Sequence, residues 1–469
     1  MRKLSPVILS IVALASACKA QQPAAGSSIV KLPLGAQIDS ALKQAERDNF
    51  SGVALVAKNG EVILQKGYGL ANRAEQIPMT AETIVQIGSN TKDFTALSIL
   101  QLMERGRLKL TDSIGKFFQN VPADKRGVTI EMLLKHRSGF PEYMGPDFDV
   151  VTREQEIRNA LAAPLRFSPG TGRAYSNVGY SLLGAIIEQI SGKSYDVYVH
   201  DEILEPIGLK ETGFLLPEFD AKRLAHGYSN GIDRGTMLAK PHAKDGPYWN
   251  LRANGGMLST VGDMYHFYDV LAGEKLLKAQ TRDLMFPPNQ PVILAGSDMV
   301  NYFIYDREPQ LGLVVILASN AAAVTAQRVR DRIAPVLGLQ SAGGRRNPAN
   351  AGEAETQQAL TDLPSTPAAN TVRAYFKAFN SGDPAVMGEF MRTSTIQAPG
   401  DTRTLDQRLD AYKTMHGDIG NLKLLGMVSS TPDQIVVRAS AGNGDTLTLS
   451  FGVESQSPYR LKGIRIEAQ

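Results

Sequence analysis

The sequence turns on one stretch, Gln86-Ile87-Gly88-Ser89-Asn90-Thr91-Lys92. Apolar residues follow it at intervals of three up to Gly106, which predicts a helix from Ser89 to Arg105. Residues three apart are neighbours on a helix, so Lys92 is expected on the same helical face as Ser89. The stretch therefore predicts a serine and a lysine side by side at the start of a helix.

This pair has the chemistry of a candidate nucleophile and base. Serine is a weak nucleophile and needs an adjacent base. A lysine that is shielded from water can lose its proton and act as that base, and the positive end of a helix favours a developing anion. A Ser-x-x-Lys pattern arises about once or twice by chance in a chain this long. This motif alone is therefore equally compatible with a structural interpretation, in which Ser89 caps the start of a helix that faces solvent.

A second stretch, Phe167–Tyr180, is a loop bent by glycine and proline that contains Tyr175-Ser176-Asn177 and enters a second predicted helix, Val178–Ile190. Together with the first stretch it resembles the family of class C β-lactamases, D-alanyl-D-alanine carboxypeptidases and related esterases. The resemblance covers residues 30–339, with the motifs in family order. Further stretches that carry it are Met132–Pro141, Leu204–Leu209 and Gly255–Thr260.

The resemblance implies a serine hydrolase in which Ser89 is acylated on an ester, an amide, a D-amino-acid peptide or a β-lactam. It implies that Lys92 and Tyr175 share the general-base and general-acid work and that Asn177 orients the substrate. A phenol titrates near pH ~10, so Tyr175 acts as a base only if positive charge, expected from Lys92, lowers its pKa. No metal or organic cofactor is implied, and no cluster of His, Asp and Glu has metal-ligand spacing.

The third family motif is where this sequence departs from the pattern. The family places Lys-Thr-Gly or His-x-Gly on a strand beside the nucleophile, and the matching position reads Leu294-Ala295-Gly296-Ser297. Gly296 is kept, and the Ser297 backbone N–H is expected to join that of Ser89 in an oxyanion hole. Because Leu294 replaces the cation, carboxylate recognition is weakened and neutral esters or amides are favoured. The alternative is a catalytically degenerate penicillin-binding-like receptor or binding module.

The fold implied for residues 30–339 is α/β (α+β), of the serine β-lactamase and penicillin-binding-protein type. An antiparallel sheet flanked by helices and a helical subdomain are expected. Strand patterns flank the hairpin turn Asn59-Gly60, and a strand at Leu311–Ala318 precedes a helix at Val324–Val336. The terminal strands of this domain are expected to lie together.

A linker by composition, residues 340–368, separates this domain from residues 369–469. Three helical patterns and then four alternating runs predict a small α+β accessory domain. Its opening, Ala374–Asp383, loosely resembles nuclear-transport-factor-2-like folds. Such a domain can host a ligand or pair subunits, so it remains a rival candidate for the working part of the protein.

Residues 1–20 read as a signal segment, with Arg2 and Lys3 ahead of a short apolar core, and residues 21–29 as a tether. The only cysteine, Cys18, follows small residues, which allows either lipidation at Cys18 or plain cleavage nearby. The protein is expected to be exported, periplasmic, and tethered to a membrane if Cys18 carries lipid. A net charge of +3 over 469 residues gives no basic stripe for nucleic acid. The oligomeric state is not predicted.

Overall fold

The computed structural model describes residues 28–229, 231–322, 324–339, 367–396, 403–430, 434–441, 446–454 and 456–468. The chain divides into two compact units, residues 1–352 and 353–469. The predicted signal segment, Cys18, and nearly all of the predicted tether and linker lie outside the described residues. None of the described helices is both long and apolar enough to cross a membrane.

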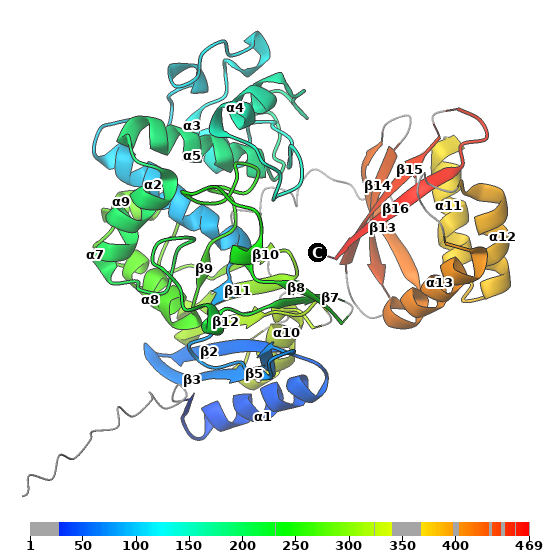
Figure 1. Ribbon diagram of the computed structural model, residues 1–469, viewed down its shortest axis with the longest axis horizontal. Helices are drawn as coiled ribbons and strands as arrows, with labels where there is room; N and C mark the ends of the chain where they lie inside the picture. The colour runs from blue at the N-terminus through cyan, green and yellow to red at the C-terminus, as the bar shows by residue number, and fades with distance from the viewer. Residues whose placement is uncertain are drawn as a thin grey trace, which may run out of the picture. The chain divides into compact units, whose positions relative to one another are not determined.

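The first unit is built on a six-stranded antiparallel sheet with the strand order β1-β3-β2-β12-β11-β10 (Figure 1). Its strands are β1 (Ile29–Val30), β2 (Gly52–Lys58), β3 (Glu61–Tyr68), β10 (Val292–Asp298), β11 (Asn301–Glu308) and β12 (Leu313–Ser319). Asn59 and Gly60 both have positive φ and turn the predicted hairpin between β2 and β3. Strand β12 pairs with β2, so the terminal strands lie together as predicted.

The two faces of this sheet bury separate apolar layers. Val315 and Leu317 of β12 pack into a layer with helices α1 (Leu34–Arg47) and α10 (Ala326–Leu337). The alternate residues Ile316 and Ala318 belong to the larger core on the other face, as expected because successive side chains on a strand point to opposite faces. The larger core is shared with α2 (Thr91–Glu104), α5 (Asn177–Ser191) and α8 (Val261–Ala272).

Helix α5 confirms the second helical pattern and ends at Gly192, whose φ is 73°. The first pattern needs a correction at its start. Ser89 lies in a tight 3₁₀ turn, Gly88–Asn90, and α2 begins at Thr91. The remaining helices are α3 (Ile130–Leu134), α4 (Arg153–Ala162), α6 (Tyr195–Val199), α7 (Glu205–Ile207) and α9 (Ala279–Arg282). Short strand pairs are β4 (Leu70–Asn72) with β5 (Ile77–Pro78), β6 (Val85–Gln86) with β9 (Leu258–Ser259), and β7 (Gly227–Ser229) with β8 (Ile232–Gly235).

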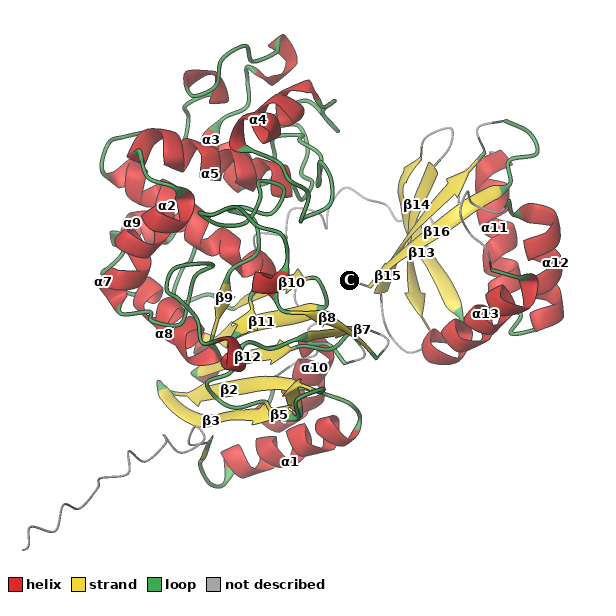
Figure 2. Cartoon of the chain, viewed as in Figure 1, coloured by secondary structure: helices red, strands yellow, loops and turns green. Residues whose placement is uncertain are grey.

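The second unit has three helices and a four-stranded antiparallel sheet in the order β13-β14-β15-β16 (Figure 2). The helices are α11 (Pro367–Asn380), α12 (Pro384–Ser394) and α13 (Leu405–Ile419). The strands are β13 (Leu422–Ser430), β14 (Gln434–Ala441), β15 (Thr446–Val453) and β16 (Leu461–Ala468). Phe379, Tyr375 and Phe451 pack in its core. The predicted small α+β domain is therefore present, and its first helix begins two residues before the expected boundary.

Candidate active site

The turn that carries Ser89 is pressed against strand β10. Gly88 has a φ of 53°, and a Cβ placed on it would lie 2.3 Å from the Ser297 backbone nitrogen. A Cβ on Gly296 would lie 2.6 Å from the Ser89 nitrogen and 2.2 Å from the Ile87 carbonyl oxygen. Both positions therefore require glycine, and this contact places the backbone nitrogens of Ser89 and Ser297 beside one another, as an oxyanion hole needs.

Ser89 receives two side chains from different parts of the chain. The Lys92 Nζ lies 3.1 Å from the Ser89 Oγ, and the Tyr175 phenol donates a hydrogen bond of 2.7 Å to the same oxygen. Lys92 arrives from the first turn of α2, whereas Tyr175 comes from the loop just before α5. The structure thus brings together the three predicted residues, which lie 3 and 86 positions apart.

Lys92 is 5% exposed and lies over the rings of Tyr175 and Tyr180, at 4.8 and 5.6 Å from their centroids. Its Nζ also donates a 2.6 Å hydrogen bond to the Asn254 carbonyl oxygen. Burial lowers the pKa of Lys92 to about 7, although the charge of Asp298 acts in the opposite direction. A substantial share of the amine is therefore unprotonated near neutral pH, as a general base requires.

Three consecutive carbonyl groups fix the segment that holds Lys92. Arg252 O accepts a hydrogen bond from Ser181 Oγ at 3.1 Å, Ala253 O from Thr95 Oγ1 at 2.7 Å, and Asn254 O from Lys92. Ala253 has a φ of 66°, in the left-handed region. Helices α2 and α5 thus clamp this segment through its main chain.

The side chain of Arg252 anchors the same segment from the other side. It is 1% exposed, and its guanidinium forms ion pairs with Asp245 at 2.8 Å and Glu188 at 3.3 Å. A buried guanidinium needs such partners because an unpaired buried charge is strongly destabilising. The family-like stretch Gly255–Thr260 begins at the next residue, but no residue type in the segment marked its contact with Lys92, since that contact uses a backbone carbonyl rather than a side chain.

The expected lowering of the Tyr175 pKa is not found. Burial of the Tyr175 hydroxyl holds its pKa well above the usual value, although the residue as a whole is 38% exposed. Its ring lies 4.5 Å from that of His136, whose Nδ1 accepts the Ser176 N–H at 3.1 Å. Burial lowers the pKa of His136 to about 3, so this imidazole is neutral. Tyr175 is therefore placed as a protonated hydrogen-bond donor, and Lys92 is the group able to accept a proton.

The other predicted site residues lie around this centre. Asn177 is the first residue of α5, and its side-chain amide has no hydrogen-bond partner among the described residues. Gly296 and Ser297 are on β10, opposite Phe303 and Tyr302 of β11. Leu294 is partly buried on the same strand, packed against the larger core.

Two carboxyl groups near Lys92 were missed by the sequence analysis. Asp298 is 8% exposed, and its Oδ2 accepts the Gly256 N–H at 2.7 Å. Burial raises its pKa to about 6. Asp147, in the loop before α4, is half-buried, and burial raises its pKa as well. Asp298 directly follows the Gly296-Ser297 motif, which is a usable signal, whereas nothing near Asp147 in the sequence marks it.

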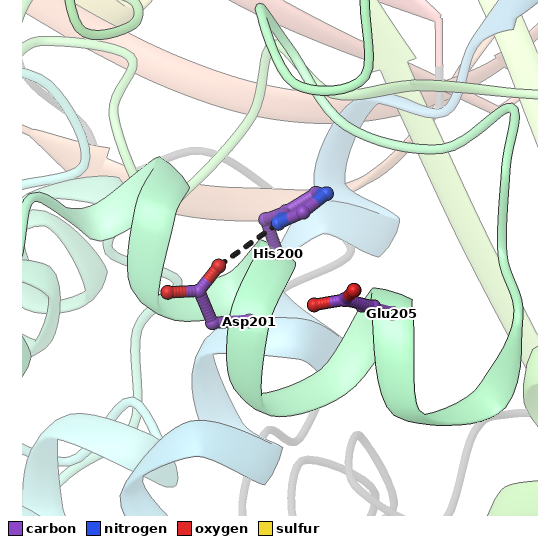
Figure 3. A group of neighbouring side chains, drawn as sticks. All are labelled: His200, Asp201 and Glu205. Carbon is purple, nitrogen blue, oxygen red and sulfur yellow. Dashed lines mark hydrogen bonds and ion pairs between the residues drawn. The ribbon is translucent and has the colours of Figure 1, made fainter.

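The sequence analysis found no cluster of His, Asp and Glu with metal-ligand spacing, but one group among the described residues, His200, Asp201 and Glu205, has the composition of a metal site (Figure 3). A π-helical turn brings His200 and Glu205 together, because its hydrogen bond runs from the Glu205 N–H to the His200 carbonyl. Asp201 already accepts hydrogen bonds from the His200 ring at 3.0 Å and from Lys193 at 2.9 Å. The group is partly exposed, and the carboxylate of Asp201 is already paired with Lys193, so no catalytic role is assigned to it.

A model of the family described as Beta-lactamase matches residues 38–315, more than half of the chain. The chain belongs to the beta-lactamase family. It is 28% identical to Penicillin-binding protein 4* of Bacillus subtilis over 288 residues, covering 58% of this chain and 63% of that protein. It is 34% identical to Protein flp of Staphylococcus aureus over 202 residues, 41% of each chain. The chain therefore spans less than two thirds of the length of these curated relatives.

Solved structures agree on the fold of this family member. FmtA from Staphylococcus aureus matches with a TM-score of 0.57 at 23% identity, covering 67% of this chain and 93% of that one. The hydrolase EstCE1, described as having promiscuous acyltransferase activity, matches with 0.54 at 21%, covering 65% and 98%. The D-amino acid amidase of Ochrobactrum anthropi matches with 0.55 at 23%, covering 65% and 97%. At these identities the likeness establishes the fold of the first unit.

Proposed function

We propose that this beta-lactamase family member is a serine hydrolase that forms an acyl-enzyme at Ser89. The observation that carries the proposal is the pair of contacts on the Ser89 Oγ, from Lys92 Nζ at 3.1 Å and Tyr175 Oη at 2.7 Å. One partner can accept a proton and the other can donate one, so the oxygen has a base and an acid at once.

In the acylation step, the neutral Lys92 amine takes the proton of the Ser89 hydroxyl as Oγ attacks the substrate carbonyl carbon. Negative charge develops on the carbonyl oxygen, where the N–H groups of Ser89 and Ser297 stabilise it. The Tyr175 phenol then gives its proton to the leaving alcohol or amine, and the proton held by Lys92 replaces it. In deacylation Lys92 takes a proton from the water molecule that attacks the acyl-enzyme ester. Tyr175 gives its proton to the Ser89 Oγ as the bond between Oγ and the acyl carbon breaks, the proton on Lys92 passes to Tyr175, and the carboxylic acid product leaves.

The proposed substrates are esters, amides or D-amino-acid peptides. The relatives and the structural neighbours include penicillin-binding proteins, an amidase and EstCE1, so the family relationship supports hydrolysis without selecting one substrate. Leu294 supports a substrate without a recognised carboxylate, because an apolar side chain stands where the family pattern has a cation. The same replacement favours the rival proposal, a binding module that is no longer acylated.

Intact-mass measurement after treatment with a fluorophosphonate tests the two proposals. The Ser89 Oγ would displace fluoride from phosphorus and leave one covalent adduct. We expect this adduct on the native chain and on Ser168→Ala, which removes an exposed serine from the loop before Tyr175. We expect no adduct on Ser89→Ala. A folded native chain that gains no adduct would support the binding module instead.

We propose further that the protein is exported to the periplasm and tethered by lipid on Cys18. The proposal is supported by the basic start, short apolar core and small residues ahead of the only cysteine. Mass spectrometry of the N-terminal peptide from membrane fractions tests it, with Cys18→Ser as the control. If the mature N-terminus is another residue and carries no lipid mass, the proposed tether is wrong, whereas the proposed export still holds.

A further inference from the structure

Strand β10 presents an unusual set of side chains to the acylation site. Leu294, Gly296 and Asp298 share one face of the strand, because alternate residues point the same way. Gly296 on this face meets the turn of Ser89. The face therefore carries an apolar residue at the position of the family cation, the oxyanion-hole glycine, and then a carboxylate.

We propose, on the basis of the proposed hydrolase function, that the site selects substrates with a positively charged ammonium group near the scissile carbonyl, recognised by Asp298 and Asp147. The preference is for cationic over isosteric neutral acyl groups, and anionic groups are the least favoured. This deepens the proposed function by naming the charge class of the substrate.

The placement of Asp298 carries the first part of the argument. It is more than nine-tenths buried, and its Oδ1 lies against Gly255, where an added Cβ would be 2.8 Å away. Among the described residues, the backbone N–H of Gly256 is the one hydrogen-bond donor to Asp298. A buried carboxylate with a single neutral donor is poorly compensated, since burying a charge is costly unless a counter-charge is present. A bound cation would supply that counter-charge.

Asp147 carries the second part. It follows Pro146, whose carbonyl oxygen accepts a 2.7 Å hydrogen bond from the Asn250 side chain, so its loop is held against the segment that leads to Gly255. The charge of Asp147 raises the pKa of Asp298, and the charge of Lys92 lowers the pKa of both carboxyl groups. Among the described residues neither aspartate forms a salt bridge. Two mutually repelling carboxylates in one site are stabilised together by a cation bound between them.

The other charged groups of the site do not offset the negative charge of the two aspartates. Lys92 experiences the charges of Asp298, Asp93, Glu142 and Asp147. Arg173 is the second cation, and its charge acts on His136 and Tyr180. Lys92 can act as the base only in its neutral form, and in that form it no longer offsets the negative charge around Ser89. A cationic substrate is therefore best matched to the state of the enzyme that attacks.

Three 4-nitrophenyl esters test the proposal, two of nearly equal shape and a third that is anionic and smaller. Their acyl groups are 4-(trimethylammonio)butanoyl, its neutral isostere 5,5-dimethylhexanoyl, and the anionic glutaryl group. Values of kcat/KM are measured at pH 8, where the aspartates are ionised, with the spontaneous hydrolysis subtracted. We expect the cationic ester to be favoured over the neutral one by about tenfold or more, since one charge pair at close range is worth at least that factor in a partly shielded site.

Variants connect the preference to the two residues. Asp298→Asn and Asp147→Asn each remove one negative charge, so each is expected to reduce the preference at least about threefold. Asp298→Asn keeps an oxygen acceptor for the Gly256 N–H, and Asp147→Asn changes a separate loop. The matched control is Asp149→Asn, an exposed carboxylate two residues from Asp147, which should leave the preference unchanged. Leu294→Lys leaves both aspartates in place and is expected to shift the preference towards the glutaryl ester.

The outcomes separate the two proposals. Hydrolysis of the neutral ester with no cationic preference would overturn the ammonium proposal and leave the hydrolase. A preference that survives both aspartate variants would overturn the assignment to these residues. If no ester is hydrolysed and Ser89 gains no fluorophosphonate adduct, both proposals fail. If circular dichroism shows that Asp298→Asn is unfolded, the decision rests on Asp147→Asn and Leu294→Lys.

Discussion

The pKa of Lys92 makes the pH dependence of acylation the sharpest test of the active site. With the ordinary value of 10.5, about one amine in a thousand would be unprotonated at pH 7.5. With the buried value of about 7, roughly three quarters are unprotonated. Burial therefore raises the concentration of the competent base several hundredfold at this pH.

The sign of the pH dependence follows from this group. The folded-state pKa is lowered, so the base is protonated and acylation slows as the pH falls below about 7. We expect the single-turnover rate constant of Ser89 acylation by a neutral aryl ester to fall about tenfold per pH unit below that value and to level off above it. Because Asp298 raises the pKa of Lys92, Asp298→Asn should move this limb to lower pH.

The pH dependence of the acylation rate constant is measured by stopped flow, as the release of 4-nitrophenol between roughly pH 5 and 10. The absorbance is read at the isosbestic wavelength of 4-nitrophenol and its anion, so that the signal does not itself depend on pH. Lys92→Arg should remove both the limb and most of the rate, since a guanidinium keeps its proton over this range. Asp149→Asn should leave the limb in place. A limb near the ordinary lysine value, or an unchanged profile in Lys92→Arg, would refute Lys92 as the base.

Three further predictions concern the parts that surround this base. Gly296→Ala should reduce kcat by about a hundredfold or more, because the new Cβ would lie 2.6 Å from the Ser89 nitrogen. The control is Gly127→Ala, which should keep the native kcat because a Cβ at this position meets nothing within 4 Å. Tyr175→Phe should lower kcat by about 10²–10⁴ with little change in thermal melting, and full activity in this variant would exclude the phenol as the proton donor. Arg252→Met should destabilise the first unit by roughly 1–3 kcal/mol in urea unfolding, because the Pro247 carbonyl and Glu188 lose their bonds to the buried guanidinium, although Glu188 keeps its ion pair with Arg153. An unchanged midpoint would contradict that role.

Much of the fold could be predicted because it depends on local signals. Asn59-Gly60 fixes a hairpin whatever surrounds it, since both residues tolerate positive φ. Gly192 ends α5 in the left-handed conformation that glycine adopts without strain. Lys92 could be placed beside Ser89 because a spacing of three is fixed by helical geometry, even though the helix itself starts two residues later than predicted.

The remainder of the site depends on contacts that leave no local pattern. The Asn254 carbonyl reaches Lys92 from 162 residues away, and every residue has a carbonyl, so no residue type marks it. The charge of Asp147 acts on Lys92 only because the fold brings together a loop and a helix that are far apart in the sequence. The expected lowering of the Tyr175 pKa was wrong because burial of the phenol, which raises the pKa, outweighs the hydrogen bond to Ser89, which lowers it, and the sequence does not show how deeply the hydroxyl is buried.

The main-chain clamp at Arg252, Ala253 and Asn254 separates two properties that substitutions can change. The carbonyl that holds the base, like the two oxyanion N–H groups, belongs to the backbone, so replacing the side chain at position 254 does not delete it. The polarity of the β10 face beside Ser89, in contrast, is set by side chains, such as the apolar Leu294 and the carboxylate of Asp298. If the proposed function is correct, a few point substitutions on β10 are therefore expected to change which substrates are accepted while the main-chain groups around Ser89 keep their positions.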